Sequence, residues 1–175
     1  MGGARLSQRA WCVQIGPPTY ARRVLTIARA HVDAIIAHAR ADFPDEACGV
    51  VVGPEGSDSP ERYVKMTNAE RSPTFFQFDS GEQLALYKEM DANDEEIVVV
   101  YHSHTFTEAY PSRTDINLAQ EPGAHYVLVS TRDGADSPAY DGPVEFRSYR
   151  IVDGEVTEEE VRVVGSYGES PEGED

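Results

Sequence analysis

The chain has 175 residues, of which 31 are acidic and 15 basic, and its formal net charge is -16. The length suits one domain with a buried core, because domains usually span about 100 to 200 residues. The acidic balance argues against a nucleic-acid partner, since a phosphate backbone attracts basic patches, and against an anionic membrane surface. No apolar run approaches the roughly 18 residues of a membrane span, and the first residues lack the pattern of a secretory signal, so we expect a cytoplasmic protein.

Strand and helix patterns alternate along most of the chain. In chain order we expect strands at 24–27, 47–53, 62–68, 97–104, 126–130, 144–152 and 155–164, and helices at 28–42, 80–90 and 111–120. Ser80 and Gln83 have the spacing of a capping box, and Asp153-Gly154 predicts a two-residue hairpin turn. These elements predict a mixed α/β domain of the α+β type, with an antiparallel C-terminal part. We expect this domain to span 24–164, between a loosely structured extension at 1–23 and a disordered acidic tail at 165–175.

The strand expected at 97–104 ends in two histidines that suit a metal ion. Side chains alternate along a strand, so His102 and His104 project to the same side, about 7 Å apart at the backbone. Asp115 follows at the start of the next helix. Two histidines and one carboxylate form a catalytic zinc set, because a three-ligand site leaves the fourth position to water. Cys12 and Cys48 are too few for a closed thiolate site or a disulfide framework.

A hydrolase of this kind also needs a group that accepts the proton of the attacking water. Glu46 is the candidate, because an acid at the entry of a buried apolar strand needs a reason to be there. Ser112 is placed to donate a hydrogen bond to the developing oxyanion, an interaction worth about 3 kcal/mol in the transition state.

Each part of this pattern also has a structural interpretation. Ser112 to Asp115 is typical of an ordinary helix N-terminus, and the two histidines could be satisfied core residues. The combination rarely arises by chance, which favours the metal site. The remaining candidates receive structural assignments: partly exposed His31 and His38, a packing His125, a buried Cys48, and solvated charge runs at 94–96 and 158–160.

Glu46 with His102-Ser103-His104, Ser112 and Asp115 resembles the JAMM, or MPN-plus, metalloproteases, which cleave bonds after the C-terminal tails of ubiquitin-like proteins. The resemblance covers about 25–164. Four further segments, at 44–49, 68–73, 79–83 and 109–115, are similar to an actinobacterial branch that hydrolyses a cysteine from the C-terminus of a ubiquitin-like sulfur-carrier protein in cysteine biosynthesis. Many members have proline directly after the second histidine, where this chain has Thr105.

The resemblance implies that His102, His104 and Asp115 bind one Zn²⁺ per chain, that Glu46 is the general base and acid, and that Ser112 is the oxyanion donor. It implies a curved mixed β-sheet flanked by helices, like that of the zinc deaminases. The implied reaction is hydrolysis of a Gly-Cys amide, and the implied partner is a sulfur-carrier protein with a Gly-Gly C-terminus.

Two alternatives remain open. One is a broader isopeptidase that removes a ubiquitin-like modifier from proteins, and the other is a metal-free MPN scaffold, against which the complete ligand set argues. The segment at 72–78 holds Phe75, Phe76 and Phe78, which could line a narrow cleft for a glycine tail or pack in the core.

Overall fold

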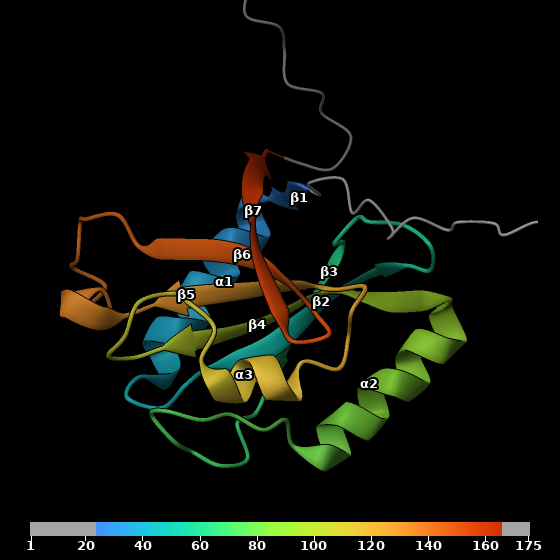
Figure 1. Ribbon diagram of the computed structural model, residues 1–175, viewed down its shortest axis with the longest axis horizontal. Coiled ribbons are helices and arrows are strands. Elements are labelled where there is room, and N and C mark those ends of the chain that lie inside the picture. The colour runs from blue at the N-terminus through green and yellow to red at the C-terminus, as the bar shows by residue number, and fades with distance from the viewer. Residues whose placement is uncertain (1–23, 166–175) are drawn as a thin grey trace, which may run out of the picture.

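The computed structural model describes residues 24–165 and contains one seven-stranded sheet in the order β1-β7-β6-β5-β4-β2-β3 (Figure 1). The strands are β1 (Val24–Ala28), β2 (Cys48–Pro54), β3 (Arg62–Met66), β4 (Glu95–His104), β5 (His125–Ser130), β6 (Glu145–Val152) and β7 (Glu155–Val164). The helices are α1 (Arg29–Asp42), α2 (Ser80–Asn93) and α3 (Arg113–Leu118), with a short 3-10 helix at Arg132–Gly134. The extension expected at 1–23 and nearly all of the expected tail lie outside the described residues.

The predicted strands and helices all form, and each end lies within three residues of its expected position. The hairpin turn has positive φ at both Asp153 (51°) and Gly154 (81°), as a two-residue turn between twisted strands requires. The capping box expected at Ser80 is wrong by one residue. The cap of α2 is Asp79, whose carboxylate accepts from the backbone N–H groups of Gly81 and Glu82, because a negative charge suits a helix N-terminus.

The sheet is mixed, and its order brings distant parts of the chain together. β4 pairs with β5 in parallel, and β1 pairs in parallel with β7, so the first and last strands lie side by side. The remaining neighbours are antiparallel. The expected mixed sheet with flanking helices and an antiparallel C-terminal part is confirmed.

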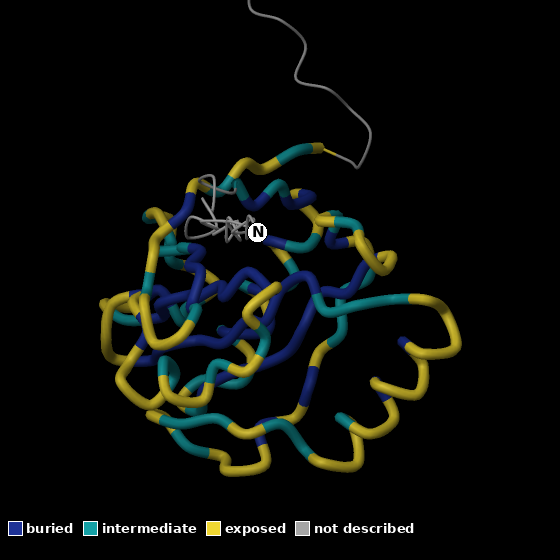
Figure 2. Tube along the Cα trace, turned by 45° about the vertical axis from the view of Figure 1, so that its right-hand side comes forward, coloured by how far each residue is buried: buried dark blue, intermediate teal, exposed yellow. Residues whose placement is uncertain are grey.

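Both faces of the sheet are covered, by α1 on one side and by α2 and α3 on the other (Figure 1). The α1 face buries an apolar cluster that includes Leu25, Ile27, Ile35, Val51, Val99, Tyr101 and Val127. The opposite face buries a second cluster that includes Cys48, Val50, Met66, Leu86, Leu128 and Tyr149. Figure 2 shows buried backbone through the sheet, whereas α2 is exposed along most of its length and buries only Leu86 and Met90. Within residues 24–165, no helix is both long and apolar enough to cross a membrane.

A β-bulge in β4 determines which side chains face α3. Val51 pairs with Val99 but Val52 pairs with Ile97, so Val98 is the extra residue. Beyond the bulge the normal alternation resumes, and His102 and His104 lie on the same face as Val100, which belongs to the cluster under α2 and α3.

Candidate metal centre

His102 and His104 lie at the end of β4, where the strand passes from the buried sheet into the loop before α3. Both side chains are buried, with exposed fractions of 1% and 6%. Their Nε2 atoms are 3.2 Å apart, so the strand directs both imidazoles to one point, as the alternation predicts.

Asp115 reaches the same point from the first turn of α3. Ser112 caps this helix: its hydroxyl accepts from the Asp115 N–H at 3.2 Å, and Asp115 Oδ2 accepts from the Ser112 N–H at 2.6 Å. The same Oδ2 lies 3.4 Å from Nε2 of His102 and 3.4 Å from Nε2 of His104. The helix-cap and metal-ligand interpretations are therefore compatible, because one capping box holds the carboxylate against both histidines.

The loop between the histidines and α3 is anchored along its length. The Nδ1–H of His104 donates to the carbonyl of Glu108, and the Ser130 hydroxyl donates to the carbonyl of Thr107. Both backbone groups of Ala109 are bonded, its N–H to the Glu145 carboxylate and its carbonyl to the Tyr149 hydroxyl. These bonds attach the loop to β4, β5 and β6 and so place Asp115.

The three donor atoms fit a tetrahedral metal ion. Ligands at zinc–nitrogen and zinc–oxygen distances near 2 Å around a tetrahedral ion lie roughly 3.3 Å from one another, and the separations here are 3.2, 3.4 and 3.4 Å. Among the described residues, these three form the group of histidine, cysteine and acidic side chains able to share one ion.

The protonation states of His102 and Asp115 suit metal binding, whereas the pKa of His104 is raised, because the Asp115 carboxylate and the Glu108 carbonyl outweigh its burial. The bond from His104 Nδ1–H to Glu108 leaves the Nε2 lone pair directed at the shared point. Burial lowers the pKa of His102, which favours its neutral form. Burial opposes ionisation of Asp115, but the adjacent imidazoles of His102 and His104 outweigh it and hold the pKa of that carboxyl well below its usual range.

Glu46 enters the site from the strand beside β4. Cys48 pairs with His102, and Ala47 is bonded to Ser103 twice, through its N–H to the Ser103 hydroxyl and through its carbonyl to the Ser103 N–H. One further step along this antiparallel pair places Glu46 opposite His104. Glu46 is only 4% exposed, and burial raises the pKa of its carboxyl to about 7, with Asp115 adding to the rise and His104 opposing it. A carboxyl in this range can take up and release a proton near neutral pH.

A groove of about 410 Å³ runs from the donor cluster between α3 and the loop before α2. Phe75, Phe76 and Phe78 line it, together with His102 and Asp115. Phe76 and Phe78 also pack against the core cluster on that face. Lining a cleft and packing in the core, the two roles considered for these phenylalanines, are therefore compatible. The Phe76 ring stacks on the His102 ring at 4.6 Å between centroids.

We expect Phe76→Ala to raise the KM for a tail substrate about fivefold, because the variant removes a ring that forms a groove wall. Bound metal should remain, since the ligands themselves are unchanged. The measurement is steady-state kinetics beside Val163→Ala, a partly exposed aliphatic truncation on β7. An unchanged KM in Phe76→Ala would remove the groove from substrate binding.

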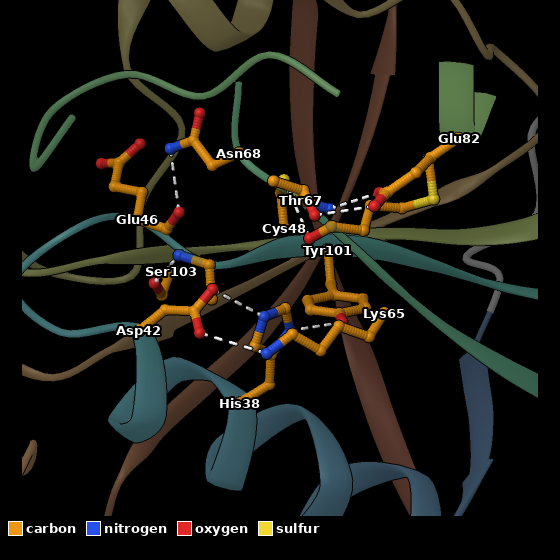
Figure 3. Close-up of polar contacts among 12 residues, drawn as sticks. His38, Asp42, Glu46, Cys48, Lys65, Thr67, Asn68, Glu82, Tyr101 and Ser103 are labelled. Carbon is orange, nitrogen blue, oxygen red and sulfur yellow. Dashed lines mark hydrogen bonds and ion pairs between the residues drawn. The ribbon is translucent and has the colours of Figure 1, made fainter. Parts of the chain in front are cut away.

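Two of the structural assignments made from the sequence are wrong. His38, expected to be partly exposed, is 4% exposed, because its ring lies between Tyr101 Oη (2.8 Å) and the Asp42 carboxylate (2.9 Å), as Figure 3 shows. Glu159, expected to be solvated, is 8% exposed and is held by His125 (2.5 Å) and the Ser148 hydroxyl (2.8 Å). His31 is partly exposed, and His125 packs within the fold, as expected.

Cys48 is fully buried in the core, and burial raises the pKa of its thiol to about 12. At pH 8 this thiol therefore stays protonated and inaccessible. In a Cys12→Ser background, we expect iodoacetamide to leave Cys48 unmodified in the folded protein and to label it fully in denaturant, as read by intact mass. Rapid labelling without denaturant would contradict the buried placement.

Sequence reasoning named Thr105 and the segment that begins at Asn68 but did not predict the contacts that these two residues make beside the site. Thr105, which directly follows the second histidine, is buried, and its hydroxyl donates a hydrogen bond to the carbonyl of Pro73 at 2.8 Å. Asn68 is 5% exposed and donates to the carbonyl of Glu46. An asparagine at the end of a predicted strand, before a long segment without a helix or strand pattern, was the available signal for Asn68.

A profile described as prokaryotic homologs of the JAB domain matches residues 28–152. The chain therefore belongs to the JAB domain family, and the resemblance to the JAMM/MPN class is confirmed. It is 64% identical over 144 residues to a CysO-cysteine peptidase from Mycobacterium tuberculosis (strain ATCC 25618 / H37Rv), which covers 82% of this chain and 94% of that protein.

Two further relatives span most of the domain. A desampylase from Haloferax volcanii is 27% identical over 132 residues, covering 73% of this chain and 94% of that protein. The solution structure of protein DSY2949 from Desulfitobacterium hafniense superposes with a TM-score of 0.68 at 30% identity, covering 83% of this chain and 96% of that one.

Proposed function

We propose that this chain is a zinc-dependent peptidase that hydrolyses the Gly-Cys amide at the C-terminus of a ubiquitin-like sulfur-carrier protein and releases cysteine. The observation that carries the proposal is the convergence of His102, His104 and Asp115 on one point, beside a buried Glu46 and at the end of a groove. The 64% identity to a CysO-cysteine peptidase supports the choice of substrate.

His102, His104 and Asp115 would hold zinc, which when bound acts as a Lewis acid on the scissile carbonyl and lowers the pKa of water. Glu46 takes one proton from the attacking water and later gives it to the leaving nitrogen. The Ser112 oxygen accepts from the Asp115 N–H, and its O–H donates a hydrogen bond to the oxygen of the attacked carbonyl. One C–N bond breaks and one water is consumed, which yields a glycine carboxylate on the carrier and free cysteine.

The groove suits an extended tail of glycines. Without side chains, glycine residues leave the aromatic walls as the main contacts and let the backbone approach the donor cluster closely. Tyr87 and Leu118 line the groove and are exposed, so we expect the folded body of the carrier to lie against this side of the molecule.

A second candidate is removal of a ubiquitin-like modifier from protein lysines, which the similarity to a desampylase favours. The two activities differ in the group that follows the Gly-Gly tail, a free cysteine in one case and a substrate protein in the other. A metal-free binding scaffold is disfavoured by the spacing of the three donor atoms.

The test is intact-mass spectrometry of a sulfur-carrier protein ending in Gly-Gly-Cys after incubation with this protein, with and without a chelator. A Gly-Gly isopeptide-linked substrate is incubated in parallel. Chelator-sensitive loss of one cysteine with the isopeptide intact is the expected result. Cleavage of the isopeptide alone would establish the second candidate, and cleavage of neither by the zinc-loaded protein would contradict both.

A further inference from the structure

We propose that Asn68 is a positioning residue that fixes the backbone of Glu46 and the aromatic wall of the groove relative to each other. The proposal rests on the proposed peptidase function, because it assigns Glu46 to proton transfer and the groove to the substrate tail. Asn68 follows the edge strand β3 and contacts neither the donor atoms nor the groove surface, so its effect would be exerted through these two segments.

The side-chain amide of Asn68 has four hydrogen bonds. Its Nδ2 donates to the carbonyl of Glu46 at 3.0 Å and to the carbonyl of Phe75 at 3.0 Å. Its Oδ1 accepts from the N–H of Glu70 at 3.1 Å and from the N–H of Gln77 at 3.2 Å. The full capacity of an amide, two donated and two accepted hydrogen bonds, is therefore used in a site that is only 5% exposed.

These bonds connect Glu46 to the loop rather than to the sheet. The Glu46 carbonyl accepts from Asn68, and the Glu46 N–H donates to the carbonyl of Ser72 at 2.9 Å. Both backbone polar groups of the proposed base thus depend on the segment at 68–78. Figure 3 shows the Asn68 amide directed at the Glu46 backbone, while the Glu46 carboxylate remains free of that contact.

Two further hydrogen bonds of the Asn68 side chain lie on either side of Phe76, the residue that contacts a proposed metal ligand. The Phe75 carbonyl and the Gln77 N–H lie on either side of Phe76, whose ring stacks on His102. The segment has little regular structure of its own. It contains one isolated antiparallel bridge between Asn68 and Phe78, flanked by bonds from the Ala69 N–H to the Gln77 carbonyl and from the Asp79 N–H to the Thr67 carbonyl, and one turn bond from the Arg71 N–H to the Asn68 carbonyl. The Asn68 side chain adds its four hydrogen bonds to these few backbone bonds, and it is the side chain that joins the segment to Glu46.

Asn68→Asp is the sharpest test, because aspartate keeps the shape and the accepting oxygen but replaces the donor with an oxygen that faces two carbonyls. We expect kcat to fall and KM to rise, each about fivefold or more, since misplacement of reacting groups by even 1 Å is costly. Bound zinc should stay at one per chain. The matched control is Thr67→Ala, which removes a contact of the neighbouring exposed hydroxyl with Glu82 and should stay within about twofold of wild type in both constants.

Amide hydrogen exchange gives a readout that does not depend on activity. In Asn68→Ala we expect faster exchange across 69–78 and at the Glu46 N–H, and no such change in Thr67→Ala. Circular dichroism establishes that each variant is folded before either measurement.

The outcomes separate the two proposals. If the wild-type protein releases no cysteine from a Gly-Gly-Cys carrier, the proposed function fails, and the exchange data alone decide whether Asn68 orders both segments. If the wild type releases cysteine but folded Asn68→Asp retains its kcat and KM, or Thr67→Ala is impaired equally, the positioning role is wrong. Unchanged exchange in Asn68→Ala would overturn it as well.

Discussion

Glu46→Gln is expected to keep one zinc per chain and to lose about a thousandfold in kcat for cysteine release, within the range that general acid–base groups contribute. Glutamine has nearly the shape of glutamic acid, so the buried pocket should stay filled, but its amide cannot accept the proton of water. The measurement is initial-rate kinetics together with metal analysis of the same preparation.

The matched control for that variant is Glu55→Gln, which makes the same change at an exposed glutamate outside the site. Its kcat should equal that of the wild type. If Glu46→Gln turned over at the wild-type rate with full zinc, Glu46 would have no part in proton transfer, and another group would have to be found.

His102→Ala is expected to weaken zinc binding about a hundredfold or more and to reduce cysteine release to background. Changes to groups that merely support metal ligands already cost about 10- to 100-fold in affinity, so loss of a ligand should cost at least as much. Zinc should also cease to stabilise the fold. For the wild type, a metal concentration of 100 times Kd would add about 2.7 kcal/mol to the free energy of unfolding.

The loss of zinc-dependent stabilisation is measured by thermal melts with and without added zinc, together with metal analysis of the same protein. His31→Ala is the control, because His31 is partly exposed on α1 and is not among the converging donors. The control should show the wild-type zinc-dependent rise in Tm. An equal rise in His102→Ala would exclude His102 from the metal site.

Local patterns predicted most of the elements, and the reasons can be seen in particular segments. The apolar run at 97–100 and the turn at Asp153-Gly154 are strong local signals, and β4 and the β6–β7 hairpin form where they lie. Alternation along β4 placed both histidines on one face, and the spacing to Ser112 and Asp115 predicted the helix that returns the carboxylate to them.

What could not be predicted depends on contacts between distant parts of the chain. The parallel pairing of β1 with β7 has no local signal. His38 is buried because Tyr101 lies across the sheet face from α1, and Glu159 is buried because His125 comes from another strand. Asn68 acquires its role only when Glu46 and Phe75 are brought to it.

The proposed ligands and the proposed base come from separate stretches of sequence, so they reach the site at different stages of folding. The three donors lie within positions 102–115, two at the end of β4 and one in α3, with a single loop between them. Because this loop is short, little chain entropy is lost in bringing the donors together. Glu46 arrives only when β2 has joined β4 and the segment at 68–78 is in place. On the proposed assignment, a maturing chain would bind its metal before Glu46 is in place, and the zinc content of a preparation would set an upper limit on the fraction of competent enzyme rather than measure that fraction.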